Sequence, residues 1–339
     1  MLTKSIQHAA DFMGQTGTPL ALIVALLGGA TVGLLFPGVS EHASSQIDLT
    51  LLVLVFCLLF DVRLKEIGAS IKRPVFIGIA LFTNFVIVPA IGYSISSILM
   101  AEHPLFFVGL TIYFLSPCTD WFLGFTRLAK GNTALGATLL PINLLVQLLL
   151  YPVYLDLFGI QDSVAVSQNM FGVLWQWFLV PLVLSVVARF CAERFLNSAN
   201  LAVLQDVVSL AVPLLLAFVV GQIAAANIAT LAEHVAIVPL MLGAILIFFA
   251  LTFSASWILS RLMNFAYEDQ VLLTMTTAAR NAPLMLAVTV TVIPDQPVIY
   301  AAIIIGMLIE LPHLILLKTI LLRQFKATNG QPVQPAVQA

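Results

Sequence analysis

Apolar residues in this chain occur in long continuous runs, separated by short segments that hold charge, glycine and proline. A helix needs about 20 predominantly apolar residues to cross a hydrocarbon core about 30 Å thick. The pattern therefore predicts ten membrane-spanning helices, the second of which is weakened by the charged residues at its end. The predicted spans lie near residues 18–36, 48–62, 74–99, 104–128, 133–156, 170–190, 205–228, 235–260, 268–293 and 297–320.

Composition supports the same conclusion and excludes a water-soluble domain of appreciable size. Of the 339 residues, 61% are hydrophobic and only 9% are charged, and the mean hydropathy is +1.07. A soluble protein carries about 25% charged residues, so this chain cannot cover a surface in contact with water. Its net charge of −2 provides no basic field for a nucleic acid. We expect an all-α polytopic membrane protein surrounded by the lipid bilayer.

The basic residues indicate how the spans are oriented. With the N-terminus inside, every Lys and Arg except Arg280 lies in a cytoplasmic connection, in a tail or at the adjoining helix end. The opposite side carries acidic residues and histidines without any Lys or Arg. Because cytoplasmic loops are enriched in Lys and Arg, we predict a multi-pass protein of the cell (inner) membrane. Residues 1–17 and 321–339 would be its cytoplasmic tails.

The ten spans divide into two halves of five, at residues 18–156 and 170–320. Since five is odd, the second half begins on the opposite side of the membrane, which permits an inverted repeat. The fourth span of each half is interrupted near its midpoint, by Leu115–Asp120 and by Thr276–Pro283. Pro117 and Pro283 each remove a backbone donor and clash with the preceding turn, so we expect helix breaks. Paired interruptions of this kind point to a transporter's binding site.

Polar residues deep in the predicted spans are the candidates for such a site. An ionisable side chain at the centre of a membrane helix costs about 2.5–3.5 kcal/mol on insertion scales, so it usually faces a cavity or a partner. The candidate substrate- and ion-binding residues are Asn84, Cys118, Thr119, Asp120, Asn143, Arg280, Asn281 and Glu310.

Two of the charged candidates are expected to pair. Asp120 and Arg280 each lie within a few residues of a helix break, and the two breaks occupy equivalent places in the two halves. Because an uncompensated buried charge is expensive, we predict that these two side chains meet, in either a structural or a substrate-binding role. Glu310 has no evident cation near it in the sequence, which makes it the better candidate for carrying a proton.

The residues around the breaks also resemble a known family. The segments Leu115–Asp120 with Ala129–Asn132, Asn143–Pro152, and Ile309–Pro312 are similar to helices 4, 5 and 10 of the arsenical-resistance (arsenite-efflux) permeases, a branch of the bile acid:sodium symporter superfamily. The resemblance implies two inverted five-helix repeats in which the broken helices 4 and 9 cross. It also implies that Cys118 and Glu310 take the places of the family's helix-4 cysteine and helix-10 glutamate, and that Asn84 and Asn143 match its polar positions in helices 3 and 5.

The chain departs from the family pattern at two positions. The arsenite exporters usually have an uncharged residue where Asp120 stands. Their ninth helix, like that of the sodium-coupled relatives, generally carries an acidic residue near the break, where this chain has Arg280. Because of these departures, the resemblance alone fixes neither the family's sodium site nor the substrate for this chain.

These features favour a secondary active transporter. The chain has no phosphate-binding loop for ATP and none of the hydrolase motifs, so we expect no catalytic residue, no metal site and no cofactor. A channel or an intramembrane enzyme is the more remote alternative.

Two classes of substrate stay open. Arsenite or antimonite would use Cys118, because soft ions prefer thiolate, whereas an organic anion would use Arg280 and the N-termini of the half-helices. We rank arsenite-type efflux slightly ahead of organic-anion symport, with H⁺ or Na⁺ as the coupling ion.

Overall fold

The structure is a computed structural model that describes residues 17–60, 73–118, 121–160, 172, 175 and 179–328. Within these ranges all regular elements are helices. Five of the described helical stretches are long and apolar enough to cross a membrane, and four shorter apolar helices accompany them. The long stretches are Pro74–Leu99, Thr133–Leu157, Ser198–Ile228, Val235–Leu262 and Pro297–Phe325. The expectation of an all-helical polytopic membrane protein is confirmed at this level.

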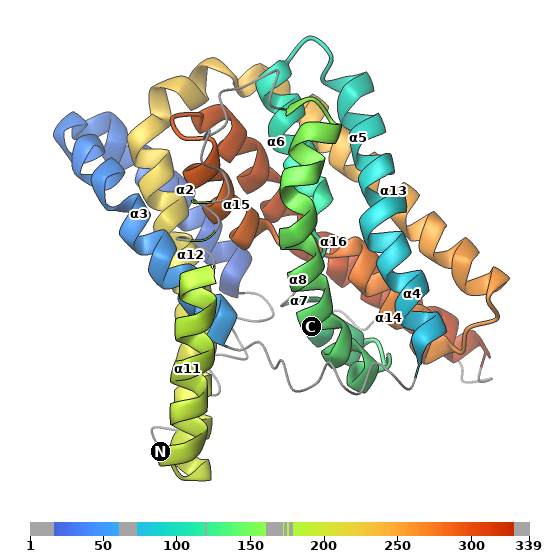
Figure 1. The fold of residues 1–339 in the computed structure, drawn as a ribbon. Helices are drawn as coiled ribbons and strands as arrows, with labels where there is room; N and C mark the ends of the chain where they lie inside the picture. Colours follow the sequence, from blue (N-terminus) through green and yellow to red (C-terminus); the bar gives the residue numbers. More distant parts are fainter. Residues whose placement is uncertain are drawn as a thin grey trace.

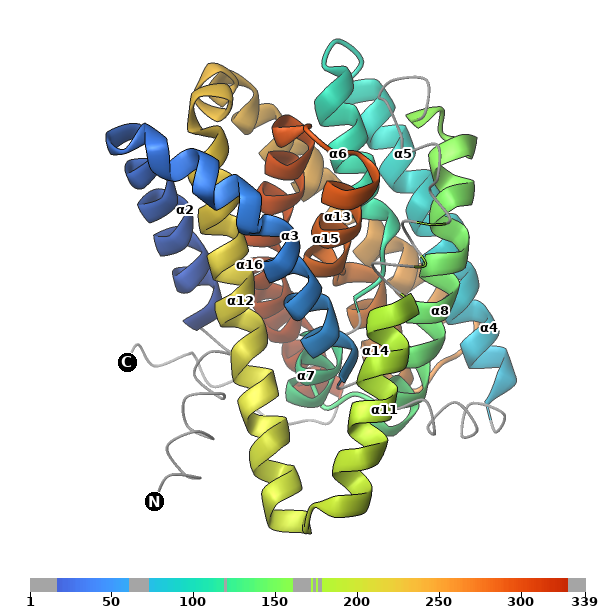
Figure 2. The same ribbon diagram turned by 60° about the vertical axis from the view of Figure 1, so that its left-hand side comes forward.

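Four helices form a group on the left of Figure 1, which we call the four-helix group. Its members are α2 (Thr18–Leu35), α3 (Pro37–Phe60), α11 (Val180–Phe195) and α12 (Ser198–Glu233). The long helix α12 packs along both α2 and α3, and α3 also contacts α11 (Figures 1 and 2). At Gly29 the α2 backbone lies so close to α12 that a Cβ would stand 2.2 Å from the Gly221 carbonyl oxygen. Small residues that let backbones approach closely are typical of helix association in membranes.

The other helices form what we call the broken-helix group. They are α4 (Pro74–Phe82), the π-helical turn η3 (Thr83–Ile87), α5 (Val88–Leu99), α6 (Pro104–Leu115), α7 (Trp121–Leu128), α8 (Thr133–Leu157), the 3₁₀ turn η5 (Val235–Ile237), α13 (Val238–Leu262), α14 (Tyr267–Ala278), α15 (Ala282–Val292) and α16 (Pro297–Thr328). Helix α16 contacts α6, α13, α14 and α15 within the group and also reaches α2 and α12. It therefore joins the two groups.

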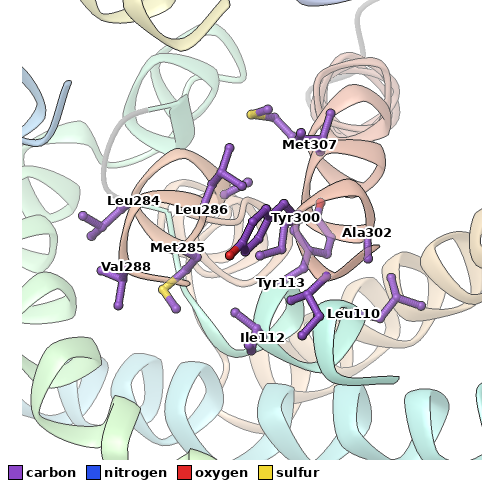
Figure 3. Packing of buried hydrophobic residues seen from close by; sticks show 14 of the residues in the cluster. Leu110, Ile112, Tyr113, Leu284, Met285, Leu286, Val288, Tyr300, Ala302 and Met307 are labelled. Atoms are coloured by element: carbon purple, nitrogen blue, oxygen red, sulfur yellow. The ribbon is translucent and has the colours of Figure 1, made fainter. Parts of the chain in front are cut away.

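Apolar side chains of α6, α15 and α16 fill the centre of the broken-helix group (Figure 3). The Tyr113 ring lies close to Gly306, where a Cβ would stand 2.7 Å from it, and the Tyr113 hydroxyl donates to the Gly306 carbonyl oxygen at 3.0 Å. Glycine at this position thus lets α6 and α16 cross at short range, four residues before Glu310.

The predicted orientation places residues 73, 132 and 269 on the same side of the membrane, and they lie together at one end of the molecule. Arg73 forms an ion pair with Asp269, and Asn132 Nδ2 donates to the other carboxylate oxygen of Asp269 at 2.9 Å. At the opposite end the rings of Phe106 and His234 lie 5.6 Å apart. Which end faces the cytoplasm is still a prediction of the charge distribution.

The helices follow the predicted spans but extend further at several ends. Helix α3 begins at Pro37 rather than near residue 48, α12 begins at Ser198, and α16 continues to Thr328. The apolar pattern marks the membrane-embedded part of a helix, whereas backbone hydrogen bonding continues beyond it. Most of 170–179 and of the predicted tails, together with residues 61–72, lies outside the described residues.

Candidate functional site

The two predicted helix breaks are present, and they are joined to each other. Helix α6 ends at Leu115 and α14 ends at Ala278, and the following segments are extended and form an antiparallel bridge between Pro117 and Arg280. The Cys118 N–H donates to the Ala279 carbonyl and the Asn281 N–H donates to the Ser116 carbonyl, each at 3.0 Å. The backbone itself therefore fixes where the two broken helices meet.

The bridge explains why proline is tolerated at its centre. Pro117 and Arg280 form the kind of antiparallel pair whose members do not bond to each other, since the flanking residues provide the hydrogen bonds. The missing N–H of Pro117 therefore costs nothing here. For the same reason the Arg280 N–H points away from the bridge, and it donates to Glu310 Oε1 at 2.9 Å.

Arg280 is completely buried, and its guanidinium contacts the ends of two helices. Nη1 donates to the Phe114 carbonyl at the end of α6 (3.0 Å), while Nη2 donates to the Thr277 and Thr276 carbonyls at the end of α14 (2.6 and 3.3 Å). The last carbonyls of a helix lack partners within the helix and form the negative end of its dipole. Arg280 thus supplies a positive charge and donors to two helix C-termini at once. The centre of the Phe248 ring lies 5.7 Å from the guanidinium carbon of Arg280.

Glu310 lies beside Arg280, although the sequence predicted no cation near it. Its side chain on α16 is buried and accepts the hydrogen bond from the Arg280 backbone, and its carboxylate also interacts electrostatically with the guanidinium. The prediction that no cation lies near Glu310 was wrong. Thirty residues separate the two in sequence, and only the crossing of α16 with the break after α14 brings them together.

A second buried contact joins three helices through polar side chains. Asn84 Nδ2 donates to Thr276 Oγ1 at 3.0 Å and to Asn143 Oδ1 at 3.5 Å, and Asn143 Nδ2 donates to the same Thr276 oxygen at 3.2 Å. All three side chains are fully buried. The predicted candidates in helices 3 and 5 therefore converge on the residue one turn before Arg280.

Asn84 occupies the π-helical turn η3, an element that often marks functional sites. Pro89 lacks the N–H that would bond to the Phe85 carbonyl in a regular helix, and the Tyr154 hydroxyl donates to that carbonyl instead, at 2.6 Å. Proline in this helix thus favours the irregular turn that carries Asn84.

Some buried polar atoms of this region have no hydrogen-bond partner among the described residues. They include Asn84 Oδ1, Gln147 Oε1 and Arg280 Nε. Buried polar atoms in native proteins are nearly always paired, so such atoms call for an explanation, for example an ion, a water or a substrate. The region has the polar capacity that a binding site needs.

The remaining predicted residues are placed as follows. Cys118 is buried among apolar side chains beside Ala278 and Ala279, whereas Cys57 lies on α3 and Cys191 on α11, and none of the three forms a disulfide. Asn281 is buried and takes part in the backbone bridge. Thr119 and Asp120 lie outside the described residues, so the pairing of Asp120 with Arg280 stays a prediction.

The hydrogen bonds of Thr276 to Asn84 and Asn143 and the contact of Arg280 with the Phe114 carbonyl were not predicted from the sequence. The first had a signal, since Thr276 precedes Arg280 by one turn in the polar interruption. The contact with the Phe114 carbonyl had no such signal, because every residue has a backbone carbonyl and the identity of residue 114 therefore does not indicate the bond. Within the described ranges no group of His, Cys, Asp and Glu is arranged to hold a metal ion.

Comparison with known proteins adds independent information. The sequence model of the Sodium Bile acid symporter family matches residues 48–231. The arsenical-resistance protein Acr3 of Alkaliphilus metalliredigens (strain QYMF) is 24% identical over 348 residues, which cover 94% of this chain and 95% of that protein. The uncharacterized protein YbaS of Bacillus subtilis (strain 168) is 24% identical over 251 residues, covering 73% of this chain and 78% of that protein.

Proposed function

Because this chain belongs to the Sodium Bile acid symporter family, it is a multi-pass membrane transporter, and we propose that it is a secondary active transporter that exports arsenite or antimonite. The observation that carries the proposal is the position of Cys118. Its backbone joins the two broken helices, so its thiol belongs to the segment that a transported ion would meet. Trivalent arsenic and antimony prefer thiolate by the same rule that governs soft metal ions. The similarity to an arsenical-resistance protein along nearly the whole chain supports the same substrate class.

The proposal includes the ten-helix inverted repeat and the inner-membrane orientation with both termini in the cytoplasm. In its support, the interrupted helices α6–α7 and α14–α15 occupy corresponding places in the two halves of the chain. The clustering of Arg73, Asn132 and Asp269 at one end fits the alternation of spans that such a repeat requires.

Transport of an organic anion is the second candidate and has less support. It relies on Arg280 as the group that binds a carboxylate. Both terminal nitrogens of Arg280 already donate to backbone carbonyls. Only Nε is without a partner among the described residues, so the guanidinium offers an anion a single nitrogen and no fork of two. Of the two coupling ions left open, the proposal takes H⁺, with Glu310 as the group that exchanges it. This role now relies on the burial of Glu310 beside the helix breaks and not on the absence of a cation.

Flux into proteoliposomes tests the substrate. Purified protein is reconstituted, and uptake of arsenite, antimonite and several organic anions is measured under an imposed proton or sodium gradient. We expect arsenite flux that is lost in Cys118→Ser and kept in the matched controls Cys57→Ser and Cys191→Ser, because those thiols lie in the four-helix group. Full arsenite flux in Cys118→Ser would mean that Cys118 is only a small packing residue beside Pro117, and would remove the thiolate from the mechanism.

A further inference from the structure

We propose that the Arg280 guanidinium occupies the place at which the ends of the two broken helices would otherwise bind a coupling sodium ion. The side chain then supplies the positive charge of that ion permanently, and transport by this chain is not driven by sodium. The inference rests on the proposed secondary transport but not on the identity of the substrate.

The carbonyl oxygens at the two helix breaks are already hydrogen-bonded. In transporters with discontinuous helices, unwound carbonyls and the C-terminal ends of half-helices coordinate the coupling cation. In this chain such carbonyls belong to Phe114, at the end of α6, and to Thr276 and Thr277, at the end of α14. All three accept hydrogen bonds from one guanidinium, at 3.0, 3.3 and 2.6 Å. The oxygen donors that a sodium ion would need are therefore engaged by a side chain.

The positive charge of Arg280 also opposes a sodium ion at this place. The guanidinium is fully buried, so its positive charge acts through a medium that screens it poorly. Of the buried acidic side chains in the described ranges, Asp269 is paired with Arg73 at the end of the molecule, and Glu310 accepts from the Arg280 backbone. A sodium ion placed among the same carbonyls would face a like charge at contact distance. The described residues do not fit a sodium ion beside Arg280.

Arg280 differs from a bound coupling ion in that it cannot leave the protein. The planar fork of arginine reaches two acceptors in fixed directions, and here it joins α6 to α14 through Nη1 and Nη2. A sodium ion can do the same and then leave down its gradient, which is how it transfers energy. A cation attached to the chain cannot leave. Arg280 therefore provides the ends of α6 and α14 with the charge of a bound cation. Their association then does not depend on sodium.

The direct test uses the wild-type protein. Arsenite flux into proteoliposomes is compared in sodium chloride and in choline chloride at the same proton gradient, and we expect equal rates. The melting temperature of the purified protein should also be the same in the two salts. A severalfold stimulation of flux by a sodium gradient, or a rise in melting temperature specific to sodium, would overturn the proposal.

A second test does not depend on any substrate. Arg280→Ala is compared with Arg261→Ala, which removes an exposed arginine that lies over Trp257. We expect millimolar guanidinium chloride to raise the melting temperature of Arg280→Ala towards that of the wild type. Urea, which has the same shape without the charge, should not, and Arg261→Ala should respond to neither. Equal responses to guanidinium and urea, or equal responses of the two variants, would overturn the proposal.

A third variant covers the case in which Arg280→Ala does not fold. Arg280→Lys keeps the charge but loses the fork, so it should melt below the wild type and show no difference between sodium and choline. Stabilisation of Arg280→Lys by sodium would contradict the proposal. Absence of arsenite flux under every gradient would count against the proposed substrate alone, because the melting experiments would still decide the role of Arg280.

Discussion

The four-helix group and the broken-helix group both pack helices closely at small residues, but they differ in how many polar side chains they bury. In the four-helix group the contact is made by backbones that approach each other at glycine and alanine. Among the buried polar or charged side chains of the described residues, only Thr50, Ser185 and Gln222 belong to that group. The others lie in the broken-helix group and include Arg280 and Glu310.

This difference is the reason why we propose that the four-helix group is scaffold and that the broken-helix group holds the site. Close packing of small residues needs no polar group and therefore tolerates the absence of water. A buried polar group has to be paired, and an unpaired one costs about 1–3 kcal/mol, so a protein keeps such groups only where they have a purpose. The contrast between the groups supports the proposal that substrate and coupling ion act at the broken helices. Variants that affect one type of contact at a time can test it.

The largest effect is expected from a side chain placed in the glycine contact of the four-helix group. Gly29→Leu would put atoms where a Cβ already lies 2.2 Å from the Gly221 oxygen, so α2 must move away from α12. Overpacking usually costs about 1–3 kcal/mol and at a backbone contact more. The neighbouring Gly28→Leu is the matched control, because nothing lies within 4 Å of its Cβ position. Similar melting temperatures for the two variants would show that close packing does not hold this group together.

A smaller loss is expected from the polar contact of the broken-helix group. Thr276→Val removes the oxygen that accepts hydrogen bonds from Asn84 and Asn143 while keeping the shape, so both amides lose a partner. We expect a destabilisation of about 1–3 kcal/mol, measured by denaturation in detergent. Thr291→Val is the control, since the Thr291 hydroxyl bonds only to carbonyls of its own helix. If both variants lose equal stability, the contact between helices contributes nothing.

The smallest effect is expected from the ion pairs. Asp269 is buried and accepts from both Arg73 and Asn132, whereas Glu193 pairs with Arg189 one turn away on α11. Arg73 is half exposed, so solvent screens that pair, and we expect Asp269→Asn to cost about 1 kcal/mol. Glu193→Gln should cost about 0.3–0.5 kcal/mol, typical of such helix pairs. Thermal melting at low and high salt measures both, and a larger loss in Glu193→Gln would reverse the expected order.

Sequence analysis could locate the helices and both breaks, because apolar runs and polar interruptions depend on local residues. The positions of the prolines alone would not have located the breaks, since other prolines lie inside helices that continue past them. These are Pro141, Pro152, Pro213 and Pro312. The breaks occur where proline adjoins a polar run. The bond from the Arg280 backbone to Glu310 could not be predicted, because it follows from the direction in which a bridge residue points and from a helix distant in sequence. The hydrogen bonds of Asn84 and Asn143 with Thr276 could not be predicted either, because they join helices that are distant in sequence.

The central claim is that the broken-helix group, and not the four-helix group, carries the transported substrate. Initial flux of arsenite, or of whichever member of the substrate panel is carried, should be measured per folded protein in proteoliposomes for Thr276→Val and Gln222→Leu. Each variant replaces one buried polar side chain, one in each group. The account predicts a loss of about tenfold or more in Thr276→Val, equivalent to about 1.4 kcal/mol, and flux close to the wild type in Gln222→Leu. Unchanged flux in Thr276→Val together with a loss in Gln222→Leu would contradict it.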